Sequence, residues 1–218
     1  MAPRAPTGKV PYITIRNKTI GDSTLCYQYL QKHEKVADVD AHLTAEERAL
    51  TASHKAWIEE WCYFLLLWDR YIENPKATKE GFFRNALPPV YRTFTGLIFS
   101  HIRRYIKKTL HCQGVSRHTK PEILMFIGDA AKNLSVLCGE NGFLDGRAAT
   151  ANACLLGLLV TIYNGPTMSP NWHREINKYP NLRTWTDGMI AKYFAERSIL
   201  PVQNLDGREK QRVQTAKT

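Results

Sequence analysis

The sequence lacks any apolar run long enough to cross a membrane. A helix that spans a bilayer needs about 18 to 20 consecutive apolar residues, and the longest candidate here, Ala153 to Tyr163, is interrupted by Gly157. The opening residues, Met1 to Pro6, have no hydrophobic core of the kind that secretory signals contain. We therefore expect a cytoplasmic protein with no membrane span, in which the apolar run is a buried helix.

Cysteine pairs with metal-binding or redox spacing are also missing. The five cysteines are scattered along the chain and include no Cys-x-x-Cys pair, which fits a reducing compartment. Among the histidines, His111 and His118 come nearest to a cluster with Cys112, but their spacing matches no zinc motif. The sequence therefore predicts no metal site.

Motifs for phosphate binding and serine hydrolysis are absent as well. There is no Gly-rich phosphate loop and no Gly-x-Ser-x-Gly elbow. The net charge of +10 raises the question of nucleic acid. However, the basic side of Arg103 to Lys108 lacks the interleaved exposed aromatics of a strand-binding groove. We interpret it as a solvated helix face and expect no nucleic-acid partner.

Helical patterns fill most of the chain, from residue 40 to residue 200. A capping box at Thr44 to Glu47 predicts the start of a long helix that stops near Asn74-Pro75. Later helices are expected at Pro88 to about Cys112, Thr119 to Gly139, Ala148 to Tyr163 and Pro180 to Ser198. The nearly all-apolar helix from Ala148 belongs at the centre of the bundle.

The long helix carries an aromatic stripe whose members recur at steps of four and three residues: Trp57, Trp61, Phe64, Trp68 and Tyr71. Such a stripe is ordinarily part of a bundle core. The alternative is that Trp57, Trp61, Phe64 and Trp68 line a pocket for a large, flat, apolar ligand. The carboxylates of the same helix, Glu59, Glu60 and Asp69, are interpreted as solvated charges or ion-pair partners rather than catalytic groups.

The N-terminal part predicts a small hairpin followed by a helix. Residues 1–8 are expected to be a disordered leader, and residues 9–39 contain two short strands, Val10 to Ile15 and Lys18 to Ile20, and a helix that starts at Asp22 or Ser23. Pro11 cannot occupy a central ladder position, so its strand should be an edge with backbone groups available for another partner. An X-Pro bond also permits a cis peptide. Residues 201–218 are expected to be a polar, frayed tail.

This order of elements resembles the glutathione transferase superfamily over residues 9–200. Motifs from Leu43 to Ala49, from Gln113 to His118 and from Phe143 to Gly146 are similar to its metaxin and axon-connection branch. The resemblance implies a mainly α fold, in which a glutathione-transferase C-terminal helical bundle follows a β-hairpin and helix that remain from a thioredoxin-like domain. The chain would begin just before the third strand of that domain.

The resemblance also implies a glutathione site. The backbone of Val10, before a cis Pro11, would pair with the cysteinyl part of glutathione, and Lys9 would hold its glycyl carboxylate. Asp22 and Ser23 would hold the γ-glutamyl group, because a helix N-terminus and a hydroxyl suit its carboxylate while the Asp22 carboxylate suits its amino group.

Two positions depart from the family pattern. The capping box of the central helix falls on Ala149 to Asn152, where both key side chains are changed, so this cap should be weaker or differently made. The residue that normally steadies the glutathione thiolate would belong to the missing strands and helices. No catalytic residue can therefore be assigned from the resemblance.

Two functions follow from these observations. The first is a glutathione-dependent enzyme that conjugates or isomerises an electron-poor conjugated small molecule. Cis/trans isomerisation by reversible thiolate addition, as in fungal secondary-metabolite transferases, is the favoured form. The second is a non-catalytic, metaxin-like interaction module. Under both, exposed strand edges and apolar patches predict a homodimer.

Overall fold

The computed structural model describes residues 10–15, 17–34, 36–83 and 94–195, and its chain divides into two units at the Thr44–Ala45 boundary. The predicted leader, Lys9, the helix start at Pro88 and the polar tail lie outside the described residues. Within the described residues, helices dominate, and a two-stranded antiparallel sheet lies near the N-terminus. The predicted mainly α fold class is confirmed.

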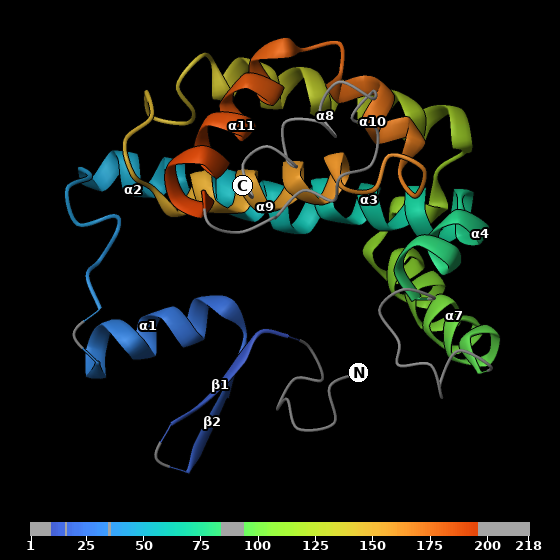
Figure 1. Ribbon diagram of the computed structural model, residues 1–218, viewed down its shortest axis with the longest axis horizontal. Coiled ribbons are helices and arrows are strands. Elements are labelled where there is room, and N and C mark those ends of the chain that lie inside the picture. Colours follow the sequence, from blue (N-terminus) through green and yellow to red (C-terminus); the bar gives the residue numbers. More distant parts are fainter. Residues whose placement is uncertain (1–9, 16, 35, 84–93, 196–218) are drawn as a thin grey trace, which may run out of the picture. The chain divides into compact units, whose positions relative to one another are not determined.

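The N-terminal unit is the predicted hairpin and helix (Figure 1). Strand β1 (Tyr12–Ile15) pairs with β2 (Lys18–Gly21), and Tyr12 lies opposite Gly21. Asn17 turns the chain between the strands with a φ of 65°, a conformation that asparagine tolerates better than most residues. Helix α1 (Ser23–His33) follows directly. The arrangement provides a helix N-terminus immediately after a strand.

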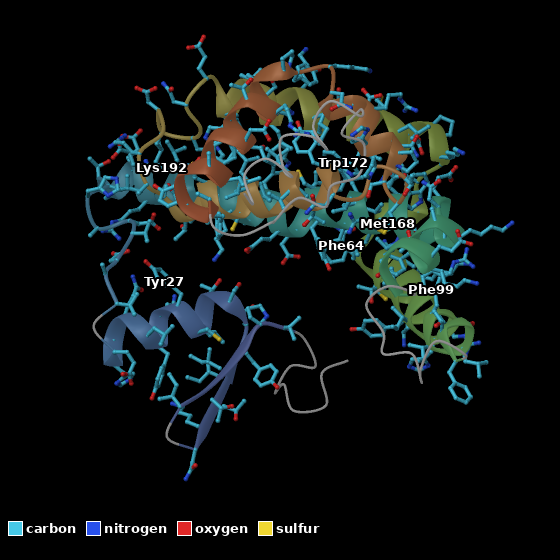
Figure 2. The ribbon with its side chains drawn as sticks, viewed as in Figure 1. Tyr27, Phe64, Phe99, Met168, Trp172 and Lys192 are labelled. Carbon is cyan, nitrogen blue, oxygen red and sulfur yellow. The ribbon has the colours of Figure 1, made fainter. Side chains whose placement is uncertain are left out.

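The core of this first unit is small. Among its described residues, the buried apolar side chains are those of Cys26 and Leu43. The connector after α1 is fixed by Tyr27, whose hydroxyl donates to the Ala37 carbonyl at 3.2 Å and accepts from the Val39 amide at 2.7 Å (Figure 2). The first unit therefore buries little apolar surface, and its polar contacts with the connector contribute to holding it together.

The second unit opens with the predicted long helix, which contains π-helical turns. Helix α2 (Ala45–Trp57) runs through η1 (Ile58–Cys62), α3 (Tyr63–Trp68) and η2 (Asp69–Glu73) without a break. Asn74 leaves helical geometry, as predicted, and Pro75 then starts α4 (Pro75–Thr78), followed by η3 (Lys79–Phe83). A π-helical turn is a rare insertion that occurs often at functional sites.

The remaining helices form the bundle shown in Figure 1. They are α7 (Thr95–Gln113), α8 (Lys120–Cys138), α9 (Thr150–Tyr163), α10 (Pro170–Ile176) and α11 (Pro180–Phe194), with a short 3-10 turn, η4 (Val115–Arg117), before α8. Helix α9 packs against α2, α10 and α11, as its apolar sequence predicts. No helix within the described ranges combines the length and apolarity that a membrane crossing needs.

The helix starts show which predicted caps form. At α8 the capping box is complete, with Glu122 Oε2 accepting from the Thr119 amide at 2.7 Å. At α9, Ala149 provides no side-chain cap. Instead, buried Asn152 accepts from the Phe143 amide at 2.8 Å and donates to the Phe143 and Arg147 carbonyls, each at 3.0 Å. The changed residues therefore make a different junction, as predicted.

Partly buried histidines predict a pH-dependent stability. Burial lowers the pKa of His54, and burial together with the Arg183 guanidinium lowers the pKa of His173, from an ordinary value of 6.5. Below that value the unfolded chain binds more protons than the folded chain does. We therefore expect the free energy of unfolding to decrease as the pH falls below about 6.5, measured by urea denaturation at several pH values.

Substituting one histidine at a time separates this effect from other titrations. His54→Gln should flatten the pH dependence, because the new side chain does not titrate. The matched control is His111→Gln, at an exposed position, and this variant should retain the parent slope. An unchanged slope in His54→Gln would contradict the prediction.

Candidate functional site

The first part of the candidate site is the chain that enters β1. The Val10–Pro11 peptide bond is cis, as the sequence permits, and Val10 is 71% exposed. Among the described residues, β1 pairs with β2 alone, so the backbone along its other edge is available to a ligand. Lys9, the expected cation for the glycyl carboxylate, lies outside the described residues.

Asp22 is held in an unusual backbone conformation at the start of α1. Its φ of 79° and ψ of 132° lie in a region that residues with a side chain rarely occupy. Conformations of this kind cost on the order of 1–3 kcal/mol and gather at functional sites. The sequence placed Asp22 at the helix start but gave no sign of this geometry.

The Asp22 carboxylate also caps the helix. Its Oδ1 atom accepts from the Thr24 amide at 2.9 Å and from the Leu25 amide at 3.3 Å. Its Oδ2 atom makes no hydrogen bond or ion pair within the described part of the chain. One carboxylate oxygen therefore orders the first turn, and the other remains available to a cationic group.

Ser23 follows as the first residue of α1, and its side chain is exposed. The amides of the first helical turn have no intrahelical acceptor, and Asp22 satisfies those of Thr24 and Leu25. Neither the Ser23 amide nor its hydroxyl bonds to any residue that the structure describes. Together with the helix dipole, these two donors favour an anion.

The predicted aromatic pocket residues lie in the second unit, and one of them, Trp57, lines a depression in the described structure. Trp68 is in the core at 5% exposure, while Trp57, Trp61 and Phe64 pack partly buried against it. Trp61 makes an edge contact with Phe126 at a ring-centroid distance of 5.5 Å. Trp57 lines a surface depression of about 310 Å³, together with His54, Asn133, Val136 and Leu137. A pocket built from all four residues stays a prediction.

A separate cavity of about 180 Å³ lies beside the same helix, and the sequence did not indicate it. It is lined by apolar, phenolic and cationic side chains: Tyr63, Leu66, Leu67, Arg70, Tyr71, Thr78 and Met168. Met168, labelled in Figure 2, reaches the cavity from the segment between α9 and α10. The one available signal was a charged pair, Asp69-Arg70, within an otherwise apolar stretch.

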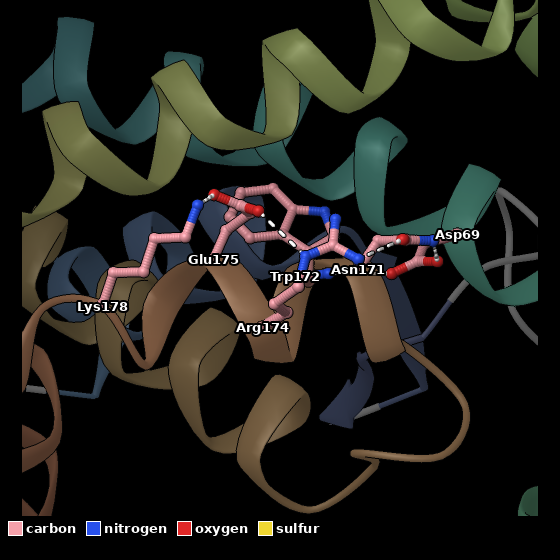
Figure 3. Close-up of polar contacts among 6 residues, drawn as sticks. All are labelled: Asp69, Asn171, Trp172, Arg174, Glu175 and Lys178. Atoms are coloured by element: carbon pink, nitrogen blue, oxygen red, sulfur yellow. Dashed lines mark hydrogen bonds and ion pairs between the residues drawn. The ribbon is translucent and has the colours of Figure 1, made fainter.

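Asp69 is wholly buried, so its interpretation as a solvated charge is wrong, and no described cation lies within ion-pair distance of its carboxylate. Its Oδ1 atom accepts from Asn171 Nδ2 at 2.8 Å and its Oδ2 atom accepts from the Trp172 amide at 3.0 Å (Figure 3). Oδ1 also accepts from Asn74 Nδ2 at 2.9 Å. Burial raises the pKa of Asp69, in opposition to the hydrogen bonds from Trp172 and Asn171, which lower it. Asp69 thus joins η2 to the first turn of α10.

A second carboxylate on α10, Glu175, is 9% exposed and lies between two cations (Figure 3). Arg174 Nε donates to Oε1 at 3.1 Å, and Lys178 Nζ donates to Oε2. Burial raises the pKa of Glu175, but the hydrogen bonds from Lys178 and Arg174 outweigh it and hold the pKa below its usual value. Its oxygens face these cations, which points to a structural role.

No three metal-ligating side chains converge within the described ranges. Comparison with known protein families shows that residues 1–77 match the glutathione S-transferase N-terminal domain. The matched residues include the Val10–Pro11 bond and the Asp22-Ser23 helix start, and continue into α4. No solved structure matches the chain.

Proposed function

We propose that this chain is a member of the glutathione transferase superfamily and binds glutathione at Val10, Pro11, Asp22 and Ser23, with Lys9 as the cation for the glycyl carboxylate. The observation that carries the proposal is the Asp22-Ser23 helix start. Asp22 has a φ of 79°, and Ser23 offers an amide and a hydroxyl that bond to no described residue. Both positions lie within the segment that matches the family's N-terminal domain.

The γ-glutamyl end of glutathione is complementary to this helix start. Its α-carboxylate can accept from the Ser23 amide and hydroxyl, and the helix dipole adds to the attraction. Its α-ammonium can pair with Asp22 Oδ2, while Oδ1 continues to cap α1. The strained backbone of Asp22 is consistent with such a role, because strain of this kind persists where function requires it.

The cysteinyl part would bind as a short added strand. The backbone groups of Val10 can exchange hydrogen bonds with the peptide, in the way that an extended ligand adds to a sheet edge. Activation of the thiol requires nearby positive charge or hydrogen-bond donors. The described residues of the first unit assign no group to that task, so the catalytic residue is not named.

The reaction we propose is reversible addition of the glutathione thiolate to an electron-poor double bond. The sulfur forms a bond to carbon, and the electron pair of the double bond moves toward the withdrawing group. Protonation of that adduct gives a conjugate. Rotation about the new single bond followed by expulsion of the thiolate gives the cis/trans isomer and regenerates glutathione. The substrate would be a conjugated small molecule, and a homodimer would protect the strand edge and the exposed apolar positions.

Calorimetric titration of glutathione tests the binding site. We expect saturable heat with the parent chain and an affinity reduced about 10-fold to 100-fold in Ser23→Ala, because a hydrogen bond to a charged group is worth about 1.5–3 kcal/mol. The control is Ser53→Ala, which removes a helical serine whose hydroxyl bonds only its own turn, at the Ala49 carbonyl. This variant should bind like the parent.

The absence of heat in the parent chain would reject the glutathione site and favour the non-catalytic interaction module. If glutathione binds, incubation with a conjugated enone tests the reaction. Chromatography should then detect either a conjugate or a changed isomer ratio that depends on glutathione.

A further inference from the structure

The cavity beside α3 is lined by the cation Arg70, whose electrostatic partner among the described carboxylates, Asp69, lies outside ion-pair distance and is occupied by other donors. No carboxylate within the described ranges forms an ion pair with the Arg70 guanidinium. Arg70 Nε donates to Ser169 Oγ at 2.8 Å, and Nη2 donates to the Thr161 carbonyl at 2.5 Å. A guanidinium has five N–H donors, so further donors remain for a ligand.

The position of the Arg70 guanidinium is fixed by its surroundings. A methyl group at Gly165 would lie 2.8 Å from Arg70 Nη2 and 2.7 Å from Met168 Cε. The Arg70 guanidinium and the Met168 methyl group can therefore lie this close to the backbone of residue 165 only because that residue is glycine. The same Nη2 atom of Arg70 donates to the Thr161 carbonyl, and Nε donates to Ser169 Oγ, so hydrogen bonds fix the guanidinium as well. A guanidinium held in this way loses little entropy when it binds a planar anion.

The other lining groups determine what kind of anion fits. Leu66, Leu67 and Met168 are apolar, and Tyr63 and Tyr71 add aromatic surface. Neither phenolic hydroxyl makes a hydrogen bond to a described residue, and both phenols interact electrostatically with Arg70. A ligand in this cavity therefore needs a carboxylate that pairs with Arg70 and an apolar body that contacts the apolar and aromatic lining.

The volume of the cavity limits the size of that body. An apolar cavity of about 150 Å³ accommodates benzene, and this one measures about 180 Å³. We propose that the cavity is a binding site for a carboxylate attached to a single aromatic ring or a chain of similar size, with Arg70 as its anion-binding residue. The site lies wholly within the second unit and does not depend on the glutathione site.

Methyl NMR can observe this site directly. The chain has four methionines, and of those that the structure describes, Met168 lines the cavity. With ¹³C-methyl-methionine protein and no glutathione, benzoate should shift the Met168 resonance saturably, and the exposed Met125 of α8 should serve as an unshifted reference. Benzamide has nearly the same shape without the charge, so it should bind about tenfold more weakly or worse.

Two variants test the assignment. Leu67→Trp fills the cavity and leaves Arg70 in place, so it should abolish the benzoate-dependent shift. Arg70→Lys keeps the charge but loses the planar fork, and it should weaken benzoate binding about tenfold. Equal affinity for benzoate and benzamide, no shift at Met168, or a full response in Leu67→Trp would overturn the proposal. Each outcome is independent of whether glutathione binds.

Discussion

Asp69→Ala is expected to lower the free energy of unfolding by about 3–5 kcal/mol. The carboxylate is fully buried and accepts from Asn74, Asn171 and the Trp172 amide. Its removal takes the side-chain acceptor from the buried Trp172 amide and from the partly buried Asn171 and Asn74 side chains, of which Asn74 keeps the Asp69 backbone carbonyl at 3.0 Å. Each buried donor left without an acceptor costs about 1–3 kcal/mol. The two asparagine side chains can partly rearrange to find other acceptors. The expected loss of stability is therefore smaller than the sum of these penalties. Urea denaturation followed by circular dichroism measures the change.

The matched control is Asp187→Ala. Asp187 pairs with Arg183 on the surface of α11, where about half of each side chain is exposed, and exposed pairs contribute about 1 kcal/mol or less. Asp69→Asn should fall between the two variants, because an amide keeps one acceptor oxygen but presents N–H groups to the remaining donors. A loss in Asp69→Ala no greater than in Asp187→Ala would show that the donors find other partners.

The partners of Asp69 explain why sequence reasoning missed it. Asn171 and Trp172 are about a hundred positions further along the chain, and the local sequence shows only a charged residue on a helix. Arg70 is similar, because Ser169 and Thr161 reach it from distant segments. Local periodicity identifies helices, but it does not show which distant polar groups satisfy a buried charge.

The aromatic stripe shows a second limit. The most deeply buried apolar positions of the long helix include Ile58, Cys62, Leu65 and Leu66, while Trp57, Trp61 and Phe64 pack beside them. The prediction assumed 3.6 residues per turn throughout. The π-helical turns at Ile58–Cys62 and Asp69–Glu73 widen the spiral and rotate the inward face. The helix could be predicted from its caps and apolar spacing. The rotation of its inward face at the π-helical turns, however, has no recognisable sequence signal.

The helix start at Asp22 was the more predictable part of the candidate site. Asp and Ser before an apolar helical pattern indicate an N-cap, and the structure confirms that Asp22 caps α1. The positive φ could not be read from the sequence, because it depends on the path that the chain takes from β2 into α1.

Asp22→Asn is expected to separate capping from ligand binding. Asparagine caps a helix about as well as aspartate does and has nearly the same shape, so the backbone strain is unchanged and the melting temperature should remain close to that of the parent. The negative charge that we assign to the γ-glutamyl ammonium is lost, and glutathione affinity should fall about tenfold or more. Thermal denaturation and calorimetric titration of the same samples measure the two quantities.

Asp22→Gly and a modified ligand complete the test. Glycine accepts a φ of 79° without a steric penalty, so relief of strain should offset much of the lost cap, while glutathione binding weakens as in Asp22→Asn. A glutathione analogue without the α-amino group should bind the parent weakly, and the Asp22 variants should no longer distinguish it from glutathione. This coupling between one carboxylate and one ammonium is what a double-mutant cycle measures. Equal discrimination in the parent and Asp22→Asn would mean that Asp22 only caps the helix, and the γ-glutamyl group would then have to bind elsewhere.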